Sequence, residues 1–276
     1  MALNSVNTNV GAMIALQNLS VTNNELSTVQ NRINTGLKVS SAKDNGAIWA
    51  IAQGQRAEIG ALNAVKDSLN RGQSAVDVSL AAGESVSDLL IQLKEKALAA
   101  TDTSLSTSAR SALNEDFTSI RDQIATVVEN ASFNGVNLLD GSSTAGFKAL
   151  ANVAGSTITI NDENMSLSGS IVTLAAAEAI DSVSTATAAL AKVDASIDNV
   201  SASLARLGTG SKSLGTHLNF VGKLQDSLEA GVGNLVDADL AKESARLQSL
   251  QTKQQLGVQA LSIANSSTSI LLGLFR

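Results

Sequence analysis

A repeat of apolar residues in the second half of the chain constrains the fold more than any other feature. The repeat alternates intervals of three and four residues over more than six heptads, with Ser211 and Gln225 as polar members. Its apolar members are Leu190, Val193, Ile197, Val200, Leu204, Leu207, Leu214, Leu218, Val221, Leu228 and Leu235. A helix in an ordinary globular bundle rarely runs past about 25 residues. The repeat therefore predicts one long helix that packs against long partner helices.

The first half of the chain carries two further helical stripes. The first comprises Leu62, Val65, Leu69, Val76, Leu80, Val86, Leu90, Leu93 and Ala97. Gly72 and Gly83 interrupt it, each at a cost of about 1 kcal/mol relative to Ala in a helix. A loop rich in Thr and Ser, residues 101–108, separates it from the second stripe, which comprises Leu113, Phe117, Ile120, Ile124 and Val127. Two stripes joined by a short loop predict a helical hairpin.

The composition fits thin cores between paired helices. Of the 276 residues, 44% are apolar but only 2% are aromatic, and the chain has no Pro. Small and branched side chains interdigitate well between two helices, and the absence of Pro leaves long helices without their commonest cause of kinks. The expected fold class is mainly α, an elongated antiparallel helical bundle or coiled coil with a small central β-hairpin region.

The predicted β-hairpin lies between the two helical halves. Phe133-Asn134-Gly135 and Leu139-Asp140-Gly141 are turn sequences. Residues 157–160, Thr-Ile-Thr-Ile, predict a strand that enters a turn at Asn161-Asp162, with residues 165–174 as a possible return strand.

Both ends of the chain are weakly amphipathic. Residues 1–31 contain a single charge, Glu25, and apolar residues are spaced along each end. Ordering a residue costs roughly 1 kcal/mol of backbone entropy, which these few apolar side chains do not offset alone. We expect the ends to order by pairing with each other and with neighbouring copies. The candidate self-assembly residues are Leu3, Val6, Val10, Met13, Leu19, Leu26, Val29, Ile33, Leu240, Leu247, Leu250, Leu261, Leu271, Leu274 and Phe275.

The sequence argues against several other classes of function. A net charge of −6 disfavours a nucleic-acid partner, and no apolar run is long enough to span a bilayer, so membrane insertion is not expected. The first basic residue is Arg32, so a cleaved signal peptide is not expected. With no Cys and His217 as the only His, neither a metal site, a bound cofactor nor a catalytic site is expected. An enzyme is the least favoured class.

Two motifs in the first half resemble signatures of bacterial flagellins. Residues 32–44 run Arg-Ile-Asn-Thr-Gly-Leu-Lys-Val-Ser-Ser-Ala-Lys-Asp and are similar to the N-terminal signature of that family. The matching residues are Arg32, Gly36, Leu37, Ser41, Ala42, Lys43 and Asp44, and Phe133, Asn134 and Gly135 look like the turn that follows the family's second helix. The opening residues 3–9, the segments 237–239 and 259–261, and the Leu-rich finish at 274–276 are also similar.

The resemblance implies a layered structure and a role in the flagellar filament. Residues 1–40 and 237–276 would form a terminal layer, residues 41–132 and 176–236 a second layer of long helices, and residues 133–175 the turn and hairpin region. The chain would be an extracellular filament subunit, a short flagellin that lacks large outer domains. Implied partners are copies of itself, the flagellar type III export apparatus, a chaperone for the C-terminal segment, and the filament cap and hook-junction proteins. We take Gly72, Gly83 and Ser211 as sites of slack that would let helices shift between packings.

One surface departs from the family pattern. Many flagellins are detected by an innate immune receptor through Arg and Leu on the first long helix and Glu on the second, and the aligned residues here are Gln92, Lys96 and Gln123. Loss of charged hydrogen-bonding groups and of an apolar anchor predicts weak recognition.

Two alternatives stay open at this stage. A hook–filament junction protein shares the terminal layers but would stop at a single ring. A secreted coiled-coil effector or an injectisome tip protein would not need both ends of the chain for self-association.

Overall fold

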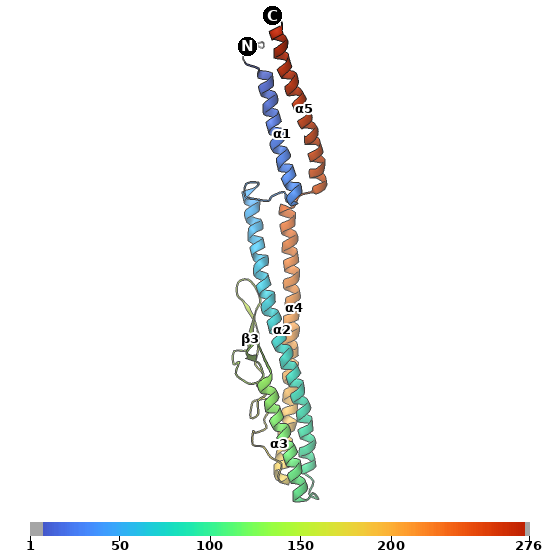
Figure 1. Ribbon diagram of the computed structural model, residues 1–276. Helices are drawn as coiled ribbons and strands as arrows, with labels where there is room; N and C mark the ends of the chain where they lie inside the picture. Colours follow the sequence, from blue (N-terminus) through green and yellow to red (C-terminus); the bar gives the residue numbers. More distant parts are fainter. Residues whose placement is uncertain (1–7, 274–276) are drawn as a thin grey trace. The chain divides into compact units, whose positions relative to one another are not determined.

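The computed structural model describes residues 8–273, and side chains for residues 8–266. The elements in this range follow the order α1 (Val10–Thr35), α2 (Gly46–Ala100), α3 (Thr107–Asn130), β1 (Ser132–Phe133), β2 (Val136–Asn137), β3 (Phe147–Leu150), β4 (Thr157–Ile160), α4 (Val183–Val236) and α5 (Leu240–Gly273). The chain forms two compact units: unit 1 comprises Met1–Ala57 and Ser227–Arg276, and unit 2 comprises Glu58–Asp226. The predicted fold class, mainly helical with a small central β-hairpin region, is confirmed (Figure 1).

Unit 1 is built on the antiparallel pair of α1 and α5 (Figure 1). Asn9 at the start of α1 donates from Nδ2 to the carbonyl of Ala264 over 2.8 Å. Towards the other end of the pair, Arg32 Nη1 lies 3.2 Å from Glu243 Oε1. Gly36 ends α1 in the left-handed region at φ 71°, which an L side chain rarely adopts. An isolated bridge between Leu37 and Asp237 then joins the segments that follow α1 and precede α5.

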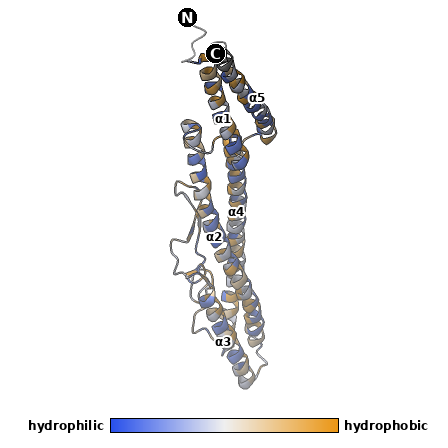
Figure 2. Ribbon diagram, turned by 45° about the horizontal axis from the view of Figure 1, so that its top comes forward, coloured by the Kyte–Doolittle hydropathy of each residue, from blue (hydrophilic) through white to orange (hydrophobic). Residues whose placement is uncertain are grey.

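In unit 2, α2 and α4 run antiparallel side by side. Lys94 Nζ lies 2.8 Å from Asp194 Oδ1, and farther along the pair Lys66 Nζ donates to Gln225 over 3.4 Å. The helix α3 returns along α2 after a loop that Arg110 closes by donating to the carbonyls of Ala100 and Asp102. Hydrophobic and hydrophilic residues alternate along these helices (Figure 2), as the predicted helical hairpin and long partner helix require.

The core of unit 2 is centred on α4. Every seventh residue of the predicted heptad repeat is almost completely buried, at Val193, Val200, Leu207, Leu214 and Val221. The intervening members Leu190, Ile197, Leu204 and Leu218 are only half-buried. The opposite flank of the helix instead buries Ser196 and Ser203, both fully. One flank of α4 therefore faces α2, and the other faces the irregular segment between α3 and α4.

The β-structure differs from the prediction in its pairing. Residues 157–160 do form a strand, but β4 pairs antiparallel with the preceding β3, with Phe147 opposite Ile160. The turn uses Asn152, whose Oδ1 accepts from the backbone of Ala154 and Ser156, followed by Gly155 at φ 87°. The possible return strand at residues 165–174 is wrong. That segment contains no strand, and its backbone is bonded to side chains of α4 instead.

Gly72 and Gly83 lie where the side chains of other elements pack closely against α2. A Cβ on Gly72 would lie 2.8 Å from Cε1 of Phe147, and one on Gly83 would lie 2.6 Å from Cδ2 of Leu204. Ser211 is likewise engaged, because Gln73 donates to its hydroxyl over 2.5 Å. In this packing the space beside Gly72 and Gly83 is filled and Ser211 is hydrogen-bonded, and the hypothesis that these positions let helices shift between packings stays a prediction.

We predict opposite effects for two Gly→Ala changes in long helices. Gly72→Ala should lower the free energy of unfolding by about 1–2 kcal/mol, because displacing the Phe147 ring outweighs the gain in helix propensity. Gly208→Ala is the matched control, since nothing lies within 4 Å of its Cβ position, and it should raise stability by about 0.5–1 kcal/mol. Urea unfolding followed by circular dichroism measures both, and equal stabilisation by the two changes would contradict this packing.

Candidate assembly surfaces

The α1–α5 pair buries some of the predicted self-assembly residues and exposes others. Leu19, Leu26, Val29, Ile33, Leu247, Leu250 and Leu261 are half-buried or buried, with Val29 and Leu250 almost completely covered. Val10, Met13 and Leu240 are exposed, by 59%, 63% and 49%. Leu3, Val6, Leu274 and Phe275, and the side chain of Leu271, lie outside what the structure describes.

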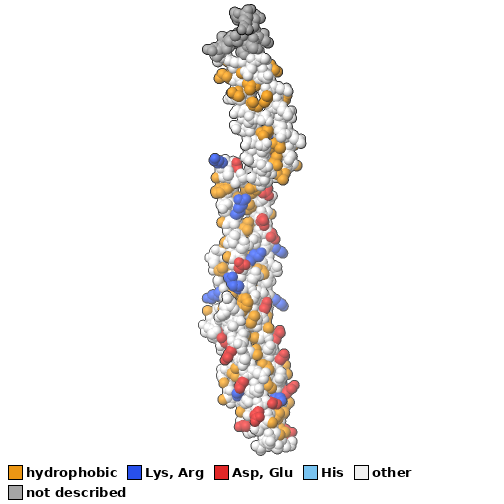
Figure 3. All heavy atoms as spheres, in the orientation of Figure 1, with side chains coloured by type: hydrophobic (Ala, Val, Ile, Leu, Met, Phe, Trp, Pro, Cys, Tyr) orange, Lys and Arg blue, Asp and Glu red, His pale blue; other side chains and the backbone are white. Residues whose placement is uncertain are grey.

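A second set of apolar residues on the same helices is exposed and lies outside the predicted self-assembly stripe. On α1 these are Ile14, Leu16 and Val21, and on α5 they are Leu256, Val258 and Ile263, all more than half exposed. Neither residues 10–24 of α1 nor residues 254–273 of α5 contain a charge. In Figure 3 hydrophobic side chains gather on the visible face of this pair. We call the six exposed residues together with Val10 and Met13 the terminal apolar surface.

The N-terminal signature forms a turn held by Asp44. Its Oδ2 accepts from the hydroxyl and backbone N–H of Ser40, at 2.9 Å each, and from those of Ser41, at 3.3 and 3.0 Å. These bonds, that from the Ser40 hydroxyl foremost, hold the pKa of Asp44 below its ordinary value. Ala42 and Lys43 are exposed. The turn sets the chain's entry into α2, where Asn45 caps the helix by accepting from Ile48.

The second family motif is a tight hairpin. Asn134 at φ 51° and Gly135 at φ 79° occupy the two central positions between β1 and β2, the conformation that Asn-Gly favours. Asn137 then fixes the exit, donating from Nδ2 to the carbonyl of Val128 and accepting at Oδ1 from Leu139. No sequence pattern predicts that the Asn137 side chain is buried and holds this turn.

The segment between α3 and α4 is anchored to the helices by polar side chains. Ser196 accepts from the backbone N–H of Thr173 over 3.1 Å, and Asn114 accepts from that of Ile180 over 2.7 Å. Arg121 donates to the carbonyl of Glu178 over 2.7 Å. Such bonds replace the strand pairing that this segment lacks.

The strongest of these anchors is a carboxylate held by α4. Arg206 donates from Nε and Nη2 to the two oxygens of Glu163, at 2.7 and 2.5 Å, and the buried Ser203 donates to Oε2 over 2.6 Å. Burial acts to raise the pKa of Glu163, but the bonds from Arg206 and Ser203 outweigh it and hold the pKa below its ordinary value. For the neighbouring Asp162, burial together with the charges of Asp140 and Glu163 raises the pKa.

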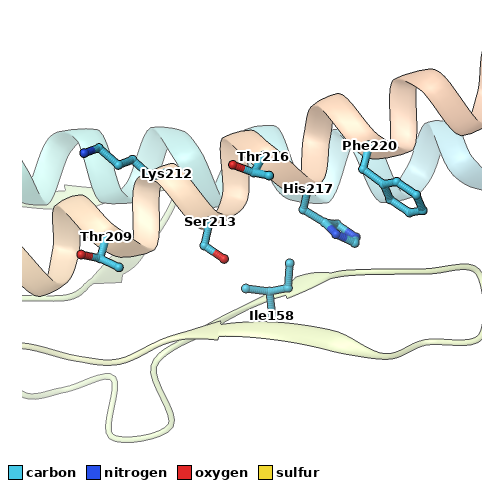
Figure 4. A pocket seen from close by; sticks show the side chains of 7 residues that line it. All are labelled: Ile158, Thr209, Lys212, Ser213, Thr216, His217 and Phe220. Carbon is cyan, nitrogen blue, oxygen red and sulfur yellow. The ribbon is translucent and has the colours of Figure 1, made fainter.

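A groove lies between α4 and the strand β4. It has a volume of about 460 Å³ and is lined by Ile158, Thr209, Lys212, Ser213, Thr216, His217 and Phe220. Figure 4 shows Ser213 and His217 directed from α4 toward the strand that carries Ile158, whereas Lys212 and Thr216 extend from the helix without pointing at that strand. The ring of His217 is 2.6 Å from the carbonyl of Ala151 through Nε2 and packs on Phe220, with ring centroids 5.7 Å apart. We call this the α4–β4 groove.

The residues aligned with the receptor surface lie on α2 and α3. Gln92 and Gln123 are exposed, and Lys96 pairs with Asp116 of α3 at 2.6 Å. Among the described residues, no group of three or more His, Asp or Glu gathers in a metal-binding arrangement. None of the helices in the described range has a stretch long and apolar enough to cross a membrane.

Comparison with known proteins matches both halves of the chain. Residues 6–144 match the bacterial flagellin N-terminal helical region, and residues 190–275 match the bacterial flagellin C-terminal helical region. The chain belongs to the flagellin family. It is 60% identical over all 276 residues to flagellin FljK and 62% to flagellin FljN of Caulobacter vibrioides, with both chains covered completely. A flagellin of Brucella melitensis is 38% identical, with 99% of each chain covered.

A solved structure shares the fold at low sequence identity. The putative flagellar hook-associated protein from Vibrio parahaemolyticus aligns with a TM-score of 0.56 and 16% identity, covering 70% of this chain and all of that one. At this identity the likeness concerns the fold alone, so the full-length matches to flagellins decide the role. The chain is a structural subunit of the extracellular flagellar filament, which flagellins form by self-polymerisation, and it belongs to a family of structural proteins, not enzymes.

We predict that the carboxylate of Glu163 stabilises the fold only when it is ionised. Glu163→Gln should lower the free energy of unfolding by about 1–2 kcal/mol at pH 7, because Arg206 and Ser203 lose a charged acceptor. A carboxyl whose pKa is lowered by folding contributes stability above its unfolded pKa of about 4.3, and this is lost as the pH falls through the folded value. The difference between variant and wild type should therefore shrink toward pH 3.

The control for this prediction is Asp162→Asn. Because folding raises the pKa of Asp162, its ionised form is a cost that is absent at low pH and appears as the pH rises through the folded pKa. This variant should raise stability at pH 7 and have little effect at pH 3. Urea unfolding midpoints across this range measure both changes, and a loss for Glu163→Gln that does not depend on pH would contradict the charged anchor.

Proposed function

We propose that the terminal apolar surface is the element through which copies of this chain polymerise. The observation that carries the proposal is the exposure of six apolar side chains in the uncharged stretches 10–24 of α1 and 254–273 of α5. They are Met13, Ile14, Leu16, Leu256, Val258 and Ile263. Exposed apolar side chains gathered in this way are typical of a surface that another protein covers. Each stabilises by about 1.5–3 kcal/mol when it is fully removed from water.

The pairing of α1 with α5 within one chain leaves the terminal apolar surface exposed to solvent. The α1–α5 contact covers one stripe of each helix, including Val29 and Leu250, while the terminal apolar surface stays open to solvent. A further layer of helices from neighbouring copies would cover it. Folding of the chain ends, including residues 1–40 and 237–276, would then be coupled to assembly. Contacts of this heterologous kind generate an open helical polymer.

The same surface bears on export and on partners before assembly. We propose that the chain leaves the cell through the flagellar type III apparatus, and that a chaperone first covers the C-terminal segment. Leu256, Val258 and Ile263 of α5 are the exposed residues that such a chaperone would shield. At the growing end, the filament cap and the hook-junction proteins would present surfaces matched to the α1–α5 pair.

We predict that polar substitution in the terminal apolar surface blocks filament growth without unfolding the monomer. The double variant Met13→Ser, Ile263→Ser should raise the critical concentration for growth from filament fragments about ten-fold or more, because both side chains are exposed in the monomer and covered in the polymer. Light scattering and electron microscopy measure growth.

The matched control is Gln17→Ser, an exposed polar change on α1 that should leave growth unchanged. Wild-type growth by the double variant would contradict the proposal, as would filaments from a chain that lacks residues 1–31 and 241–276. If the wild-type chain formed only short rings, the role would be that of a junction protein instead.

We propose further that the innate immune receptor recognises this chain poorly. Gln92 and Gln123 are exposed without the charges that the family's receptor surface carries, and Lys96 is engaged with Asp116. Purified monomer should give weak receptor signalling in reporter cells, and the triple variant Gln92→Arg, Lys96→Leu, Gln123→Glu should signal more strongly. Potent signalling by the unmodified monomer would refute this.

A further inference from the structure

A stripe of acidic and apolar residues runs along the exposed side of α2. Its members Glu84, Asp88, Ile91, Glu95 and Leu98 recur at intervals of four and three, which places them on one helix face. All five are exposed, with Ile91 at 47% and Leu98 at 56%. We call this face the acidic stripe.

The charges of the acidic stripe are not compensated within the chain. The neighbouring cations point elsewhere, because Lys94 pairs with Asp194 on α4 and Lys96 pairs with Asp116 on α3. In the part of the chain that the structure describes, no hydrogen bond or ion pair joins the three carboxylates of the stripe to another residue. The stripe therefore presents three free negative charges interleaved with two exposed apolar side chains.

The α4–β4 groove has the complementary character. Phe220, 56% exposed, and Ile158 supply apolar walls, and the exposed Lys212 supplies a positive charge with no ion pair to a described residue (Figure 4). The hydroxyls of Thr209, Ser213 and Thr216 offer hydrogen bonds. None of the described residues that line the groove is Asp or Glu, although unit 2 as a whole carries 19 acidic against 11 basic residues.

The groove and the stripe cannot meet within one chain. In the antiparallel pair of α2 and α4, the groove on α4 lies beside Gln73, which donates to Ser211, whereas the stripe lies beyond it, around Lys94 and Asp194. Eleven residues of α2 separate Gln73 from Glu84, the nearest member of the stripe, which corresponds to about 16 Å. A contact between them must therefore join two copies of unit 2 that are displaced along the helix axis, and such a contact repeats without closing.

We propose that the α4–β4 groove receives the acidic stripe of a second copy of this chain. Lys212 and Phe220 are eight residues apart and Glu84 and Ile91 seven, about 12 and 10.5 Å along their helices, so a charge and an apolar side chain can engage together. This interface rests on the proposed polymerisation and adds to the terminal apolar surface a second contact, made by unit 2. Its ion pairs orient the copies, and its apolar residues exclude water between them.

Zero-length cross-linking tests the contact directly. A carbodiimide activates carboxylates and joins them to a lysine amine only at ion-pair distance, so filaments should give cross-linked peptides between Lys212 and Glu84, Asp88 or Glu95, whereas monomers should not. Lys212→Arg is the matched control, because it keeps the positive charge but has no amine that can form the amide. It should grow normally and lose these peptides.

Charge reversal tests whether the contact contributes to growth. Lys212→Glu should raise the critical concentration for growth from filament fragments about two- to five-fold, as loss of a solvent-exposed ion pair predicts. Adding Glu84→Lys and Asp88→Lys to Lys212→Glu should restore growth, and the difference between the variants should fade at high salt. Glu129→Lys, an exposed reversal at the end of α3, should change nothing.

The outcomes separate this interface from polymerisation itself. If wild-type chains do not extend filament fragments, the proposed polymerisation fails. If they grow but Lys212 forms no cross-link to the stripe and Lys212→Glu grows like wild type, polymerisation stands and the docking of the acidic stripe in the α4–β4 groove is overturned.

Discussion

Burial along α4 is the constraint on which the rest of unit 2 depends. Val193, Val200, Leu207, Leu214 and Val221 are covered almost completely, once in every two turns of the helix. These Val and Leu side chains let α2 pack closely on one flank of α4. The approach is so close that a side chain at Gly83 of α2 would collide with Leu204. One flank of α4 contacts α2 and the other contacts the segment between α3 and α4. That segment therefore packs on the helix although it has little regular secondary structure.

That segment illustrates how polar groups set position where backbone pairing is absent. It lies on α4 through Ser196 and Ser203, which a sequence pattern assigns to the solvent because Ser is usually exposed. The Ser196 hydroxyl accepts from the backbone N–H of Thr173, and the Ser203 hydroxyl adds a donor, beside Arg206, to the buried carboxylate of Glu163. The hydrophobic seam holds the helices together, and these bonds decide where the connecting segment rests on them.

The sequence predicts part of the proposed assembly surface, and the structure adds exposed residues to it. The apolar spacing identified the stripe by which α1 and α5 face each other, including Val29 and Leu250. The exposed residues Ile14, Leu256 and Ile263 lie off that stripe, so periodicity alone discards them as scattered surface residues. That these side chains form an exposed apolar surface becomes evident only when α1 and α5 are paired and they stay uncovered.

The sequence by itself determined the helices, the Asn134-Gly135 turn and the family, because periodicity, turn chemistry and signature residues are local in the chain. Only the tertiary structure decided that β4 pairs with the strand before it, and that Gly72 makes room for Phe147. The second depends on a contact between residues 75 positions apart, and the first on a choice between two neighbouring segments, on either side of residues 157–160, that have similar local propensity. The space that α2 and α4 leave between their side chains decides which arrangement forms. That space exists only once the helices have packed together.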